Sequence, residues 1–177
     1  MHDLVKPTSE IFKVSGMMFN IGFEAITEDQ SRKQLADGAN SNTWFMGHLV
    51  TCRYHTANMM GMEVTVPWNG VFDKSIGEVD QSKMPSLSEI KTAWDKITPK
   101  MEAHFEKLDA DFLTADAPFK FPTESKSNWA AFAFMAMHEA YHVGQMSHNR
   151  RIMGVETIFS IAMKKMKAAK EQAEASA

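Results

Sequence analysis

Apolar residues recur at steps of three and four along most of this chain, and this spacing places side chains on one face of a helix. In the first such segment Phe12, Ser15, Phe19, Gly22 and Ile26 follow one another at these steps. Four further segments share the helical spacing. We therefore expect helices at 8–26, from the polar triplet 40–42 to 61, at 86–113, from 125 or 127 to 154, and at 156–174.

Residues that begin, end or bend helices support these limits. Ser86 and Glu89 have the spacing of a capping box at the start of the third expected helix. Gly61 and Gly154 stand where a glycine favours a helix end. Pro99 removes one backbone hydrogen bond inside the third helix, so a kink is expected there.

The connection at 62–85 shows no clear period of apolar positions. A loop of this length is either functional or a lid, in which Trp68 and Phe72 would cover one end of the core. No internal repeat, low-complexity tract or linker is visible. We expect one domain over 1–177, with a core at about 8–154 and a C-terminal helix and tail at 155–177. The 15 methionines and sparse glycines and prolines favour helix, so the expected fold class is all-α.

Composition removes several classes of function. The net charge of −3 argues against a dense basic face that binds nucleic acid. The sequence contains no run of eighteen apolar residues, so no membrane span is predicted. The first residues lack the basic-then-apolar pattern of a secretory signal. The single cysteine, Cys52, excludes an internal disulfide and fits a reducing compartment. We expect a cytoplasmic protein without nucleic-acid or membrane partners.

Two of the seven histidines lie four residues apart on the fourth expected helix. His138 and His142 differ by only ~40° around the axis, so one helix can offer both imidazoles to one metal ion. The same stripe carries Gln145 and Asn149 among core-forming residues, and burying these polar groups without partners is costly. A metal ion with a bound water would satisfy them, and a hydrogen-bonded histidine pair in the core is the alternative.

A third histidine on the second expected helix favours the metal. His48 lies with Trp44 on an otherwise apolar stripe, and if both stripes point inward the three imidazoles form a site with open positions, as in catalytic metal centres. His55 shares this stripe but lies about 10 Å along the axis. We therefore expect His55 to be a core histidine or to support the site. His2 and His104 show no partner pattern and are expected to be solvated.

The stretch 138–142 also reads as the H-E-x-x-H of zinc peptidases, in which the glutamate, here Glu139, is the general base. His148 stands where a longer version of that motif has its third ligand. However, the motif's glycine is displaced to Gly144, and a continuous helix rotates His148 ~80° from His138. No strand is expected beside this helix to hold a peptide. A zinc metallopeptidase is kept as an alternative.

The two histidine-bearing segments resemble the paired motifs of the DinB/YfiT-like family, in order and in a separation of about ninety residues. The first motif is NTWFMGHL at 42–49, and the second, H-x-x-x-H-x-G-Q, is HEAYHVGQ at 138–145. The resemblance spans most of the chain, to Gly154. It implies an up-down-down-up four-helix bundle, here with an extra C-terminal helix, and a common homodimer. It also implies a divalent metal ion held by His48, His138 and His142.

Members of this family include thiol S-transferases that use low-molecular-weight thiols such as bacillithiol, and a mycothiol-dependent isomerase. The resemblance therefore implies a metal-dependent thiol S-transferase or related enzyme acting on small molecules, with zinc or nickel, or else iron or manganese, and a low-molecular-weight thiol as cosubstrate. A helical bundle without chemistry, serving as a binding or stress-associated module, is the alternative from another class. The residues expected to bind substrate or support the metal site are Gln145, Tyr141, Trp44, His55 and Asn149.

Overall fold

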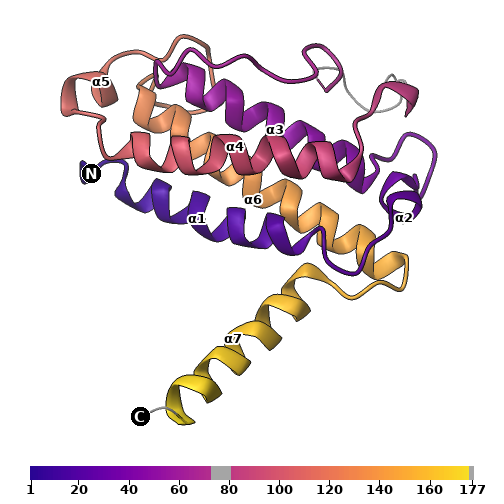
Figure 1. The fold of residues 1–177 in the computed structure, drawn as a ribbon. Coiled ribbons are helices and arrows are strands. Elements are labelled where there is room, and N and C mark those ends of the chain that lie inside the picture. Colours follow the sequence, from indigo (N-terminus) through magenta and orange to yellow (C-terminus); the bar gives the residue numbers. More distant parts are fainter. Residues whose placement is uncertain (73–80, 176–177) are drawn as a thin grey trace.

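A computed structural model describes residues 1–72 and 81–175, and this part of the chain is helical without strands (Figure 1). The all-α prediction is therefore confirmed. The elements are α1 (Lys6–Ile21), α2 (Glu28–Arg32), α3 (Asn42–Met59), the short 3-10 helix η1 (Gln81–Lys83), α4 (Leu87–Phe105), α5 (Ala110–Thr114), α6 (Asn128–Ile152) and α7 (Ile158–Ala175).

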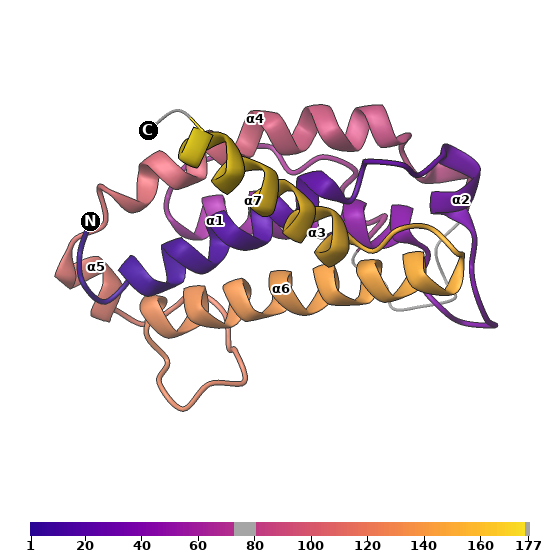
Figure 2. The ribbon, with the colours of Figure 1, turned by 90° about the horizontal axis from the view of Figure 1, so that it is seen from below.

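The four long helices α1, α3, α4 and α6 lie side by side (Figures 1 and 2). Helix α7 contacts α1 and α6, and its C-terminal part leads away from the other helices (Figure 1). Helix α1 packs against α6 and α4, and α3 packs against α4 and α6. Helices α1 and α6 begin at the end of the molecule marked by the N-terminus, and α3 and α4 begin at the other end (Figure 1). No helix in the described ranges is long and apolar enough to cross a membrane.

Aromatic side chains fill the space between these helices. The rings of Phe19 on α1 and Trp94 on α4 stack with centroids 3.7 Å apart. Phe105 contacts Phe12 at 5.6 Å and Phe132 at 5.9 Å, so α1, α4 and α6 meet at a second cluster. Burial of large aromatic surfaces is a major stabilising contribution in a domain of this size. Helix α3 packs against both α4 and α6, so the two helices that carry the paired histidines are neighbours within one packed unit.

Two expected helices end earlier in the structure than their apolar spacing predicts. Helix α1 ends at Ile21 rather than at 26, and the chain turns through Ala25, whose φ is +52°. The expected helix at 86–113 is two helices, because the side chain of Asp109 accepts a hydrogen bond from the backbone of Phe112 and begins α5. Helix α4 continues through Pro99 as one helix.

The end of α6 is tied to its neighbours by a buried cation that the sequence pattern does not reveal. Arg150 donates hydrogen bonds to the carbonyl oxygens of Gly22, Glu24 and Glu156 at 2.9, 2.7 and 2.7 Å. Burial lowers the pKa of this guanidinium, but its usual value is so high that it stays charged. Arg150 therefore joins the end of α1 and the start of α7 to α6.

Candidate metal centre

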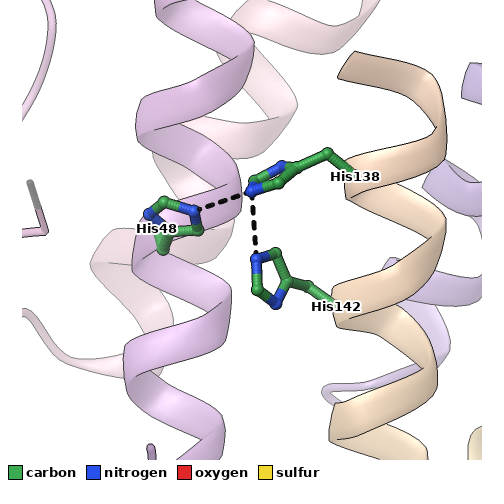
Figure 3. A group of neighbouring side chains, drawn as sticks. All are labelled: His48, His138 and His142. Atoms are coloured by element: carbon green, nitrogen blue, oxygen red, sulfur yellow. Dashed lines mark hydrogen bonds between the residues drawn. The ribbon is translucent and has the colours of Figure 1, made fainter. Parts of the chain in front are cut away.

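Three imidazoles from two helices converge at one point (Figure 3). The Nε2 atom of His48, on α3, lies 3.3 Å from Nε2 of His138, on α6. Nε2 of His142, one turn further along α6, lies 3.0 Å from the same His138 atom. These three residues are here called the histidine triad. All three residues are partly exposed, so the triad lies near the surface and not deep in the core.

The first imidazole is oriented by the backbone of the loop that follows α3. The Nδ1 atom of His48 lies 3.2 Å from the carbonyl oxygen of Phe72. Phe72 approaches this closely because Gly47 has no side chain, and a Cβ atom there would lie 2.1 Å from the Phe72 ring. Since a carbonyl only accepts, Nδ1 of His48 carries the proton. The lone pair of His48 is therefore on Nε2, which faces the other two histidines.

The second imidazole is oriented in the same way by a side chain of its own helix. The amide oxygen of Gln145 lies 2.6 Å from Nδ1 of His142, and this contact likewise places the proton on Nδ1. The other end of the Gln145 amide donates to the hydroxyl of Tyr141 at 3.3 Å. The Nε2 lone pair of His142 therefore also faces the centre of the triad.

This arrangement fits a cation better than it fits a histidine hydrogen-bond network. Two lone pairs face Nε2 of His138, and a neutral His138 has only one proton to donate to them. One metal ion would instead accept the Nε2 lone pairs of all three histidines. The Nδ1 atom of His138 is buried and has no partner in the described part of the chain, so this third imidazole has no orienting group of the kind that the other two have.

Burial also keeps the triad in the protonation state that a metal requires. Loss of hydration, followed by repulsion from neighbouring imidazoles, lowers the pKa of His48 and of His138 to about 4. Burial lowers the pKa of His142 as well, against the opposing effect of its bond to Gln145. Neutral imidazole is the form that binds metal ions. The triad is therefore ready to bind an ion near neutral pH.

Aromatic rings and one thiol surround the triad. Trp44 stacks on His48 with centroids 4.7 Å apart, and Phe45 lies 5.3 Å from His142. The buried Nε1 atom of Trp44 has no hydrogen-bond partner among the described residues. The Sγ atom of Cys52 lies 3.5 Å from Nε2 of His48. Cys52 is not among the site residues expected from the sequence, although its position one turn after His48 on the same stripe is a signal that points to it.

The glutamate of the H-E-x-x-H motif points away from the triad. Glu139 is 3% exposed and accepts two hydrogen bonds from Arg53, at 2.6 and 2.7 Å, and one from Ser15 at 2.5 Å. These bonds hold its carboxylate in the core between α1, α3 and α6, away from the position of a general base. His148 is exposed and is not in the triad. The peptidase alternative therefore lacks both its base and its third ligand.

Some of the expected site residues lie near the triad and others do not. Trp44, Gln145 and Tyr141 contact it directly or through one residue. Asn149 donates to the carbonyl oxygen of Asn40 instead, and so ties α6 to the chain before α3. His55 is exposed rather than part of the core. Met59, one turn further along the same stripe, is buried.

His2 and His104, which we expected to be solvated, are partly exposed, and each also forms one hydrogen bond. Nε2 of His104 lies 3.1 Å from the carbonyl oxygen of Met60, so it helps to hold the end of α3 to α4. Nδ1 of His2 accepts a hydrogen bond from the backbone of Leu4 at 3.2 Å. Both bonds depend on backbone geometry that side-chain patterns do not contain. Of the loop at 62–85, Phe72 is buried as expected, and 73–80 lies outside the described residues.

Comparison with known proteins gives the family but no named relative. No curated protein matches the chain. The family model described as the DinB superfamily matches residues 12–146, a range that includes most of α1, all of α3 and both histidine-bearing segments. The match covers well over half of the sequence and includes the whole triad. The chain therefore belongs to the DinB superfamily.

Proposed function

We propose that the histidine triad binds one divalent metal ion, zinc or nickel in the first place, within an up-down-down-up four-helix bundle. The proposal depends on a single observation: Nε2 atoms of His48, His138 and His142 converge, and the Nδ1 contacts of two of them direct their lone pairs to the same point. Three protein nitrogens leave positions open for other ligands, as in catalytic metal sites. The directions of α1, α3, α4 and α6 in Figure 1 support the bundle topology.

We further propose that the bound metal activates a thiol, so that the protein is a metal-dependent thiol S-transferase or a related enzyme. A metal ion at this site would act as a Lewis acid that lowers the pKa of a bound thiol or water. The three imidazole ligands are neutral and leave its charge uncompensated. Two of them are oriented by an uncharged carbonyl oxygen and an uncharged amide oxygen. This charge balance favours an anionic additional ligand, and a thiolate from a low-molecular-weight thiol fits that requirement.

The residues around the triad would divide the remaining tasks. The Phe72 carbonyl and the Gln145 amide would hold two imidazoles in position, because orienting groups of this kind tune metal affinity. Trp44 and Phe45 would exclude water from one side of the site and so strengthen electrostatic interactions within it. Tyr141, which is 58% exposed beside Gln145, would contact a polar group of the substrate at the entrance.

A thiol-transfer assay with defined metal content tests this function. The chelated protein is reloaded with zinc, nickel, manganese or iron(II), and each form is mixed with a small-molecule thiol and a chromogenic aryl halide, in which the thiol sulfur replaces the halide. We expect the zinc or nickel form to accelerate the reaction and the chelated form to give only the background rate. Metal binding without acceleration for any thiol or electrophile in the panel would instead favour a non-catalytic, metal-stabilised module.

A further inference from the structure

A groove lies on the side of α6 that faces away from the histidine triad. It has a volume of about 670 Å³ and runs between α1, α6 and the first residues of α7, which contacts both helices (Figure 2). On α6 it is lined by residues such as Ala140 and Ser147, which lie ~160–180° around the helix from His138. Cavities that bind small ligands have volumes of about 300–1,000 Å³. The apolar walls of the groove are Ile11, Val14, Met18, Val143, Ile158 and Phe159.

Polar contacts between the helices hold the walls of this groove in place. Ser15 of α1 donates a hydrogen bond to Glu139 of α6. Seven residues further along α1 and eleven further along α6, Arg150 donates to the carbonyl oxygen of Gly22. The two helices therefore run in the same direction along the groove. Arg150 also donates to the carbonyl oxygen of Glu156, just before α7, so all three walls are joined by bonds of the chain itself.

The groove has room for a ligand, and its apolar walls are open to water. Gly144 of α6 lines it, and a Cβ atom at this position would meet nothing within 4 Å. Ile11, Val14 and Phe159 are 45%, 55% and 62% exposed. Covering such apolar surface by an apolar ligand is favourable, because it removes the surface from water.

A guanidinium without a partner lies at the end of the groove where α7 begins. Arg151 and His148 both line the groove, and their spacing of three residues places them next to each other on α6. Within residues 1–72 and 81–175 the side chain of Arg151 forms no hydrogen bond or ion pair. Both residues lie beyond 12–146, the range that the family model matches, so this end of the groove belongs to the C-terminal region of this chain.

The acidic side chains of the groove and of the segments next to it are, in contrast, paired with lysines. These ion pairs are Glu10 with Lys13 at 2.7 Å, Glu156 with Lys164 at 2.6 Å, and Glu24 with Lys165. Their negative charges are therefore compensated, whereas the positive charge of Arg151 is not. Apolar walls with one positive end fit a ligand that has an apolar chain and an anionic head.

We propose that this groove binds a free single-chain fatty carboxylate of about ten to twelve carbons. Its carboxylate pairs with Arg151, as guanidinium groups do in bidentate fashion, and accepts a hydrogen bond from His148. Its chain follows the apolar walls toward Ala140. The eleven residues from Ala140 to Arg151 span ~16 Å, and C–C bonds of about 1.5 Å let an extended chain of twelve carbons cover ~16 Å. The net charge of −3 disfavours an anionic membrane surface as the ligand. This site is separate from the metal centre and does not depend on thiol transfer.

Calorimetric titration of the zinc-loaded full chain with decanoate tests the proposal. We expect one site per chain, and octanoate should bind about 4–16-fold more weakly, because each methylene group on the walls is worth about two- to fourfold in affinity. Arg151→Gln should weaken decanoate binding about 10–100-fold. The same variant should change binding of decan-1-ol, which has the chain without the charge, by less than about twofold. Lys120→Gln is the matched control, because Lys120 is exposed and does not line the groove, and it should bind both ligands like the wild type.

Two further variants locate the bound ligand. Gly144→Phe places a ring in the groove, so both decanoate and decan-1-ol should bind at least about 10-fold more weakly. Its melting temperature should not fall, because a Cβ atom at Gly144 meets nothing within 4 Å and glycine is a poor helix former. His48→Ala should bind decanoate like the wild type, since the groove and the triad lie on different sides of α6.

Four results would overturn the proposal. They are no saturable binding of decanoate below ~1 mM, unchanged decanoate binding by Arg151→Gln, unchanged decanoate binding by Gly144→Phe, and loss of decanoate binding by His48→Ala, which would place the carboxylate on the metal. Binding to anionic phospholipid vesicles without binding of free decanoate would also overturn it and would identify a membrane surface as the ligand instead.

Discussion

Replacing Glu139 by glutamine is expected to destabilise the fold without emptying the metal site. The carboxylate forms two charge-assisted hydrogen bonds with Arg53 and accepts a third from Ser15, and the Arg53 and Glu139 side chains are only 1% and 4% exposed. Arg53 also stacks on Trp94, with its guanidinium carbon 3.7 Å from the ring centroid. Glu139→Gln would leave this cation in the core without its compensating charge.

The size of the effect follows from what remains around Arg53. Removing one partner of a buried ion pair commonly costs about 3–5 kcal/mol in unfolding free energy. Glutamine keeps one oxygen acceptor, so the lower end, about 3 kcal/mol, is expected for Glu139→Gln. For a domain of this length each kcal/mol lowers the melting temperature by about 2–4 °C, which gives a fall of about 6–12 °C.

Thermal and urea unfolding of the metal-free protein measure this effect. Glu171→Gln is the control, because Glu171 is exposed and its pair with Lys167 spans 3.8 Å, and it should change the unfolding free energy by less than about 0.5 kcal/mol. The double variant Arg53→Met/Glu139→Leu removes both charges and should lose less than the sum of the two single changes. A Glu139→Gln protein that melts within about 2 °C of wild type would refute the reasoning. That limit is roughly a third of the smallest fall in melting temperature expected from the cost of breaking the ion pair.

Three further results are expected. Gly47→Ala should weaken metal binding by displacing Phe72, whereas Gly144→Ala, where a Cβ meets nothing within 4 Å, should leave it unchanged in the same titration. Gln145→Ala should lower metal affinity about 10–100-fold while one ion still binds per chain, as calorimetry would show. The metal-free protein should lose stability as the pH falls from about 6.5 toward 4, because only the unfolded chain protonates these imidazoles in that range. A His48→Asn variant should show a shallower fall in melting temperature.

The metal site could be anticipated because its ligands follow local rules. His138 and His142 are one turn apart, and both their helix and that of His48 are visible in the apolar spacing of the sequence. The orienting contact from Gln145 is also local, three residues from its partner. The contact from Phe72 is not, because it depends on where a loop 24 residues further along the chain returns to α3.

Long-range residue pairs and helix ends are harder to predict from the sequence. Arg53 and Glu139 are 86 residues apart, and no pattern within one helix indicates that a buried cation on α3 meets a buried carboxylate on α6. The capping box of Thr27 and Gln30, which begins α2, was present in the sequence but lies in a stretch too polar to suggest a helix. His55 is exposed, so only the core alternative predicted for it is wrong, because helical spacing gives the direction of a side chain and not its burial.

Calorimetric titration of chelated protein with zinc tests the central claim most directly. The wild type is expected to bind one ion per chain, and His48→Ala, His138→Ala and His142→Ala should each lose more than about 100-fold in affinity, since each removes one of three ligands. His55→Ala and His148→Ala, which change exposed histidines, should bind like the wild type. A His48→Ala protein that keeps full affinity, or a His148→Ala protein that loses it, would contradict a metal centre formed by the histidine triad.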